Sequence, residues 1–133
     1  MASDFKEYLQ EIKFEKYLSR LKKKIEGKSV VIYGCGTLFQ YIFENFDLNP
    51  MNIIGISDGK FLENQENEEC FGFKIVPKSK IKDLNPDVVL VCAMQYVEIV
   101  EDLILNQFSN TNIKVYPLAR VSFFELIKRI WSA

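Results

Sequence analysis

A strand, a glycine turn, a helix and a second strand follow one another in the first half of the chain. The apolar run Ser29–Tyr33 leads into Gly34–Thr37, which carries glycine at positions 34 and 36. Leu38–Phe46 has helical spacing, and a second apolar run, Asn52–Ser57, ends at the carboxylate of Asp58. Because two strands joined through a helix pair in parallel by a right-handed crossover, this unit constrains the fold more than any other feature.

The same unit has the parts that an anionic ligand needs. Glycines allow a sharp turn and a close approach of the backbone, and the N-terminus of the following helix presents free N–H groups. A carboxylate about 20 residues further on suits the hydroxyls of a ribose. The third position of this fingerprint holds Phe39 instead of glycine or alanine. We expect a nucleotide-containing ligand here, and a turn that binds nothing is the alternative.

Apolar periodicity predicts the remaining elements. The segment Ser3–Glu26 is helical, with a change of phase near Lys13 and a stop at Gly27. The continuous apolar run Asp87–Ala93 is typical of a central parallel strand covered on both faces. The other expected elements are a strand at Phe71–Pro77, a helical turn at Ile81–Leu84, a helix at Gln95–Phe108, a strand at Asn112–Tyr116 and an amphipathic helix at Phe123–Trp131.

Alternating strands and helices predict an α/β fold: one three-layer domain on a parallel sheet in the order 3-2-1-4-5. We divide the chain into an N-terminal helical extension (1–27), a Rossmann-like domain (28–118) and a C-terminal helix (119–133). In this order the first and fourth strands are neighbours, and ligands of open sheets bind at such a switch point. The expected ligand contacts are Gly34, Cys35, Gly36, Thr37, Leu38, Asp58, Cys92 and Ala93.

Composition narrows the classes of function. A net charge of −1 over 133 residues gives no basis for nucleic-acid binding. No apolar run reaches the roughly 18 residues that span a bilayer and no signal peptide opens the chain, so we expect a cytoplasmic location. The chain has no histidine, which disfavours a hydrolase triad and a zinc site. Its three cysteines lack CxxC spacing, which indicates neither a disulfide framework nor a bound metal.

The same turn raises two enzyme classes as alternatives. Gly-Cys-Gly-Thr looks like the first motif of S-adenosylmethionine methyltransferases, but Ile32 stands where those usually have an acidic residue. No tyrosine is followed four residues later by lysine, so short-chain dehydrogenase chemistry is unsupported. Cys35 and Cys92 are expected to face each other across the crevice, and we interpret both as packing residues rather than nucleophiles.

The residues from 28 to 118 resemble small Rossmann-like domains attached to sugar-modifying enzymes of polysaccharide and glycan biosynthesis. Such domains accompany nucleotide-sugar dehydratases, sugar acetyltransferases, methyltransferases and glycosyltransferases. The resemblance rests on four blocks in order: Val31–Gly36, Ile54–Asp58, Phe71–Pro77 and Asn85–Val91.

The resemblance implies a nucleotide or nucleotide-sugar with Gly34, Gly36 and Thr37 at phosphate and Asp58 at a hydroxyl. A glycine turn and a carboxylate without an acid–base set predict a substrate-holding or regulatory module beside a separate catalytic subunit. A homodimer formed through the terminal helices is an alternative. A nucleotide-sugar or an NAD-type dinucleotide is the expected ligand. The alternatives are an enzyme using S-adenosylmethionine or NAD, and an interaction scaffold with a vestigial site.

Overall fold

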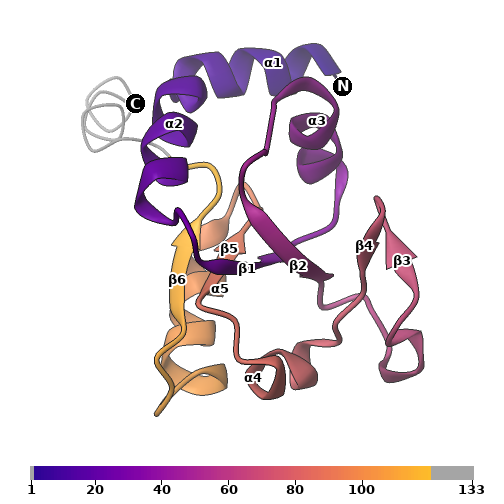
Figure 1. Ribbon diagram of the computed structural model, residues 1–133. Helices are drawn as coiled ribbons and strands as arrows, with labels where there is room; N and C mark the ends of the chain where they lie inside the picture. The colour runs from indigo at the N-terminus through magenta and orange to yellow at the C-terminus, as the bar shows by residue number, and fades with distance from the viewer. Residues whose placement is uncertain (1, 121–133) are drawn as a thin grey trace.

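The computed structural model describes residues 2–120. A parallel sheet of four strands forms the centre of the molecule, in the order β2-β1-β5-β6 (Figure 1). The strands are β1 (Ser29–Tyr33), β2 (Asn52–Ser57), β5 (Val88–Val91) and β6 (Lys114–Pro117). The predicted α/β class and parallel sheet are therefore confirmed. The predicted helix Phe123–Trp131 lies outside the described residues.

The five-stranded order 3-2-1-4-5 is not confirmed, because the predicted third strand is not a full member of the sheet. The segment Phe71–Pro77 contributes β4 (Phe73–Lys74), which pairs antiparallel with β3 (Glu69–Cys70) in a separate hairpin. Only Ile75 forms a parallel bridge, to Ile56 of β2. Two residues with positive φ reverse the chain between β3 and β4, and a proline at position 77 has no N–H to extend a ladder.

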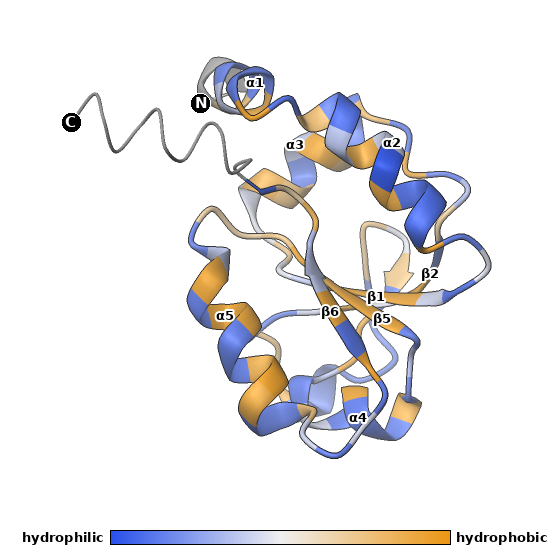
Figure 2. Ribbon diagram, turned by 90° about the vertical axis from the view of Figure 1, so that its left-hand side faces the viewer, coloured by the Kyte–Doolittle hydropathy of each residue, from blue (hydrophilic) through white to orange (hydrophobic). Residues whose placement is uncertain are grey.

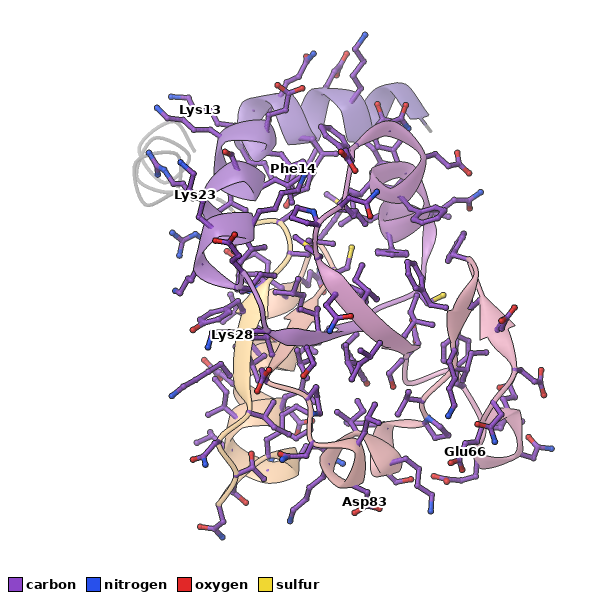
Figure 3. The ribbon with its side chains drawn as sticks, in the orientation of Figure 1. Lys13, Phe14, Lys23, Lys28, Glu66 and Asp83 are labelled. Atoms are coloured by element: carbon purple, nitrogen blue, oxygen red, sulfur yellow. The ribbon has the colours of Figure 1, made fainter. Side chains whose placement is uncertain are left out.

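Three helices lie on one side of the sheet, and the first of them packs across the other two (Figure 1). They are α1 (Ala2–Glu11), α2 (Phe14–Lys24) and α3 (Thr37–Asn45). The predicted change of phase is a break at Lys13, whose φ of 55° separates α1 from α2. Phe14 follows this break, under α1, and is 1 % exposed (Figure 3). Its ring centre lies 4.9 Å from that of Phe46, in an edge-to-face arrangement. The N-terminal helices and the sheet therefore share one apolar core.

The opposite face is covered by α4 (Ile81–Leu84) and α5 (Tyr96–Asp102), so the sheet lies between two helical layers (Figure 2). A π-helical turn, η3 (Leu103–Gln107), continues α5 over most of the predicted helix. Short 3-10 turns, η1 (Glu63–Gln65) and η2 (Lys78–Lys80), lie in the connection from β2 to β5. Because both faces of β1 and β5 are covered, their residues are almost wholly apolar and buried.

Polar contacts join the amino ends of β1 and β5. The N–H and the hydroxyl of Ser29 both donate to Oδ2 of Asp87, at 2.9 and 3.2 Å, and the N–H of Asp87 donates to the hydroxyl of Ser29 at 2.9 Å. These hydrogen bonds lower the pKa of the Asp87 carboxyl from its ordinary value, with Lys28 adding a smaller effect. The carboxylate form is therefore the one that stabilises the fold.

Acidification is expected to weaken this link. Because the pKa of Asp87 is lowered in the folded chain, its contribution is fully present above about pH 4 and is lost as the pH falls through the lowered value. Urea unfolding at pH 6 and at about pH 3 measures the loss. Asp87→Asn, which does not titrate, should lose less stability over the same interval. Equal losses in both proteins would contradict the assignment.

Candidate functional site

The turn after β1 lies between the ends of the two neighbouring strands, β2 and β5, and is in contact with both. Gly34 has a φ of 117°, and its N–H donates to the carbonyl oxygen of Ser57 at 2.8 Å. On the other side, the N–H of Cys92 donates to the carbonyl of Tyr33, also at 2.8 Å. A Cβ on Gly34 would fall onto the carbonyl oxygen of Cys92 and within 3.0 Å of its carbonyl carbon. Only glycine satisfies both the angle and the space.

The second glycine of the turn meets open space. Gly36 is the N-cap of α3 with a φ of −100°, and an added Cβ would have no atom within 4 Å. Gly36 and Thr37 are exposed, whereas Leu38 is buried in the core. Because the first-turn N–H groups of an α-helix have no intrahelical partner, the start of α3 can accept an anion from the solvent side.

Asp58 reaches the turn from the end of β2. Its Oδ2 accepts the N–H of Cys35 at 2.7 Å, and its Oδ1 accepts the N–H of Lys60 at 3.0 Å. Lys60 then donates from Nζ to the carbonyl of Cys35 at 2.8 Å. The structure thus brings together the predicted glycine turn and the predicted carboxylate. It also shows that the amide of Cys35 is already occupied by Asp58 and is not open to a ligand.

The phenylalanine at the third fingerprint position packs into the core. Phe39 is fully buried, and its ring centre lies 6.0 Å from that of Phe43 and 5.5 Å from that of Phe71. Phe71 belongs to the β3–β4 hairpin and also packs against Phe43. The large side chain therefore ties α3 to the hairpin, which is a contact that a small residue at position 39 would not make.

Cys35 and Cys92 lie in the same buried apolar cluster, and Cys35 also contacts a third thiol that was not predicted as its partner. The Sγ of Cys35 contacts the Sγ of Cys70 in β3, at 2.7 Å. Cys92 is 5 % exposed, and burial raises the pKa of its thiol to about 12. Burial, followed by the Cys70 thiol, also raises the pKa of Cys35 to about 12. Both thiols are therefore protonated at neutral pH. Ala93 packs against the apolar cluster that includes Val91 and Leu103.

Several polar residues near this edge were not identified from the sequence. Lys78 forms an ion pair with Asp102 of α5 at 3.2 Å, and its Nζ lies 5.9 Å from the ring centre of Tyr33. Burial, ahead of the neighbouring charges, raises the pKa of Tyr33. Ser57 is fully buried, and within the described part of the chain its hydroxyl has no hydrogen-bond partner. Lys60 was also not identified from the sequence, and its position two residues after Asp58 is the one feature that could have indicated it.

Other features of the molecule lie away from this edge. A groove of about 840 Å³ opens among α1, α2 and α3, and its lining includes Lys6, Lys13 and Phe14 but no residue of the glycine turn. Within residues 2–120 no group of three or more Cys, Asp or Glu side chains is placed to hold a metal ion. Over the same residues no helix has the length and apolar character needed to cross a membrane.

The fold and the turn define an α/β protein in which the first strand of a parallel sheet passes through a tight glycine turn into a helix. The model of the C2185-like, N-terminal family matches residues 26–114, and the chain belongs to this family. The match covers α3, the hairpin and the glycine turn. Comparison with curated proteins and with solved structures gave no match.

Proposed function

We propose that this protein binds a nucleotide or nucleotide-sugar at the carboxyl edge of β1 and β2. It acts as a substrate-holding or regulatory module for a separate catalytic subunit in glycan biosynthesis. The observation that carries the proposal is the open space in front of Gly36 at the start of α3, beside the carboxylate of Asp58. Cytoplasmic location and a homodimer remain predictions.

The ligand's phosphate is assigned to the N–H groups of Gly36, Thr37 and Leu38. This differs from the set expected from the sequence, because the N–H groups of Gly34 and Cys35 already have partners. The α3 dipole favours negative charge at this position, and the ammonium group of Lys60 adds a nearby cation. Each carboxylate oxygen of Asp58 accepts one backbone N–H. Because each oxygen has a second lone pair, it can also accept a hydrogen bond from a ribose hydroxyl.

The Rossmann-like sheet order is part of the same proposal. The N–H of Val76 donates to the carbonyl of Ile56 at 2.9 Å, directly after the parallel bridge at Ile75. A Cβ on Gly55 would lie 2.6 Å from Cγ2 of Val76, so the two segments are closely packed. We assign this segment to the position of the third strand, shortened by the hairpin that precedes it.

No acid–base machinery accompanies the turn, which favours binding over catalysis. The chain lacks histidine, and the buried thiols of Cys35 and Cys92 are protonated at neutral pH. Calorimetric titration with UDP-sugars, CDP, NAD and S-adenosylmethionine tests the proposal. A nucleotide or nucleotide-sugar should bind, and turnover by the isolated chain should be absent. If no nucleotide releases heat or raises the melting temperature, the proposal fails.

Gly36→Val is expected to weaken ligand binding at least about tenfold, a change of about 1.4 kcal/mol. The φ of Gly36 suits any residue, so the valine side chain projects into the open space without disturbing the core. The melting temperature should therefore change by less than about 5 °C, which reflects a weaker N-cap. Gln40→Val, at an exposed position further along α3, is the control for a valine introduced on the same helix away from its N-terminus. Unchanged affinity in Gly36→Val would place the ligand away from α3.

A further inference from the structure

Two cysteines far apart in the sequence have their sulfur atoms in contact. Cys35 lies in the glycine turn and Cys70 ends β3, and their Sγ atoms are 2.7 Å apart. Both are free thiols, and Cys35 is 3 % exposed whereas Cys70 is half-buried. A partly accessible thiol beside an enclosed one is the arrangement in which an outside oxidant reaches one sulfur and the other resolves the product.

The backbone on each side of this contact is held in place. Cys35 donates its N–H to Asp58 and accepts Nζ of Lys60 on its carbonyl oxygen. Cys70 is paired with Phe73 in the hairpin. The next residue, Phe71, packs its ring against Phe39 of α3. Separate contacts therefore hold the turn and the hairpin in the positions that bring the two sulfur atoms together.

We propose that Cys35 and Cys70 form a reversible disulfide, with a small-molecule disulfide of the glutathione class as the oxidant. The bond fastens the β3–β4 hairpin to the glycine turn. It makes the turn beside Gly36 a redox-sensitive part of the molecule. The inference rests on the two sulfurs and their supports, and it holds whether or not a nucleotide binds there.

The reaction balances in two exchanges. The Cys70 thiol loses its proton, and its sulfur attacks one sulfur of oxidised glutathione, which forms a mixed disulfide and releases one glutathione thiolate. The Cys35 thiol then loses its proton and attacks the Cys70 sulfur, which forms the Cys35–Cys70 bond and releases the second glutathione thiolate. The protein gives up two electrons and two protons, and oxidised glutathione becomes two molecules of the reduced form.

Trypsin separates the three cysteines, which makes the test direct. No lysine or arginine lies between Ser29 and Asp58, and the next cleavage sites place Cys35 in peptide 29–60, Cys70 in 61–74 and Cys92 in 83–114. The full chain is incubated with oxidised and reduced glutathione, alkylated and digested without reductant. We expect peptide 29–60 linked to 61–74, lighter by two hydrogens than their sum, and its loss after addition of dithiothreitol.

Variants and melting temperatures complete the test. Cys70→Ser should abolish the linked peptide while leaving the melting temperature of the reduced protein nearly unchanged, because the side chain is half-buried. Cys92→Ala, the matched control, should retain the link. In the wild type, oxidation should raise the melting temperature by about 10 °C, because the link closes a loop of 34 intervening residues.

Three results would overturn the proposal. They are free thiols at all three positions under oxidising conditions, a glutathione adduct on Cys70 that never resolves, and a link that involves peptide 83–114. Nucleotide titration of the oxidised and reduced protein is scored separately. A disulfide without any nucleotide binding refutes only the proposed function, and binding without a disulfide refutes only the redox inference.

Discussion

Replacing Gly34 with alanine is expected to destabilise the protein by about 3 kcal/mol or more, a large fraction of the roughly 5–15 kcal/mol typical of a native domain. Two effects add. A φ of 117° is strained for any residue with a Cβ, and the new methyl group falls onto the backbone of Cys92 at the end of β5. Because the obstacle is main chain within the central sheet, it cannot rotate away as a side chain would.

Gly36→Ala is the matched control for this experiment. It introduces the same methyl group two residues later in the same turn, where φ is −100° and the space is open. We expect a loss of about 1 kcal/mol or less, from the weaker N-cap alone. Urea unfolding of both variants and the wild type gives the comparison. Similar losses at positions 34 and 36 would mean that the turn does not press against Cys92.

Replacing Phe39 with alanine is expected to cost about 3–4 kcal/mol, in the range for a fully buried aromatic residue. The ring has no exposed surface and contacts Phe43 and Phe71, so its removal leaves a cavity and breaks the aromatic link from α3 to the hairpin. We also expect faster hydrogen exchange of the β3–β4 amides, because within residues 2–120 the segment that carries the hairpin has a single β-bridge to the main sheet, at Ile75.

Phe43→Ala serves as the control for the Phe39 variant. Phe43 lies in the same aromatic cluster but is 38 % exposed, so its replacement should cost about 1–2 kcal/mol and leave no closed cavity. Thermal unfolding followed by near-ultraviolet circular dichroism distinguishes the two variants. Equal effects would indicate that Phe39 is no more central to the core than its exposed neighbour, contrary to its burial.

Local patterns were sufficient for most of the secondary structure. The strands at Ser29–Tyr33 and Asn52–Ser57 have the predicted bounds, and the break between α1 and α2 lies at the predicted residue, Lys13. These elements are recoverable because apolar periodicity and glycine positions are properties of neighbouring residues. The approach of Asp58 to the glycine turn was also predictable, because parallel strands end at the same edge of the sheet.

The hairpin and its contacts were not predictable in the same way. Phe71–Pro77 reads as a strand, but Phe71 adopts a φ of 55° and turns the chain back onto Cys70. A phenylalanine in this conformation carries no local signal. Its ring packs against Phe39 and Phe43 of α3. The stabilisation from this packing depends on a helix that lies more than twenty residues earlier in the chain.

The sequence by itself determined the α/β class, the parallel pairing of β1 with β2, and a glycine turn that opens α3 beside a carboxylate. Only the tertiary structure decided which amides of that turn remain available, that Phe39 lies in the core, and that Cys35 contacts Cys70. The physical reason is the separation along the chain of the residues that interact. Strand and helix patterns arise from residues a few positions apart, whereas these contacts join segments that meet only after the sheet and the hairpin have packed.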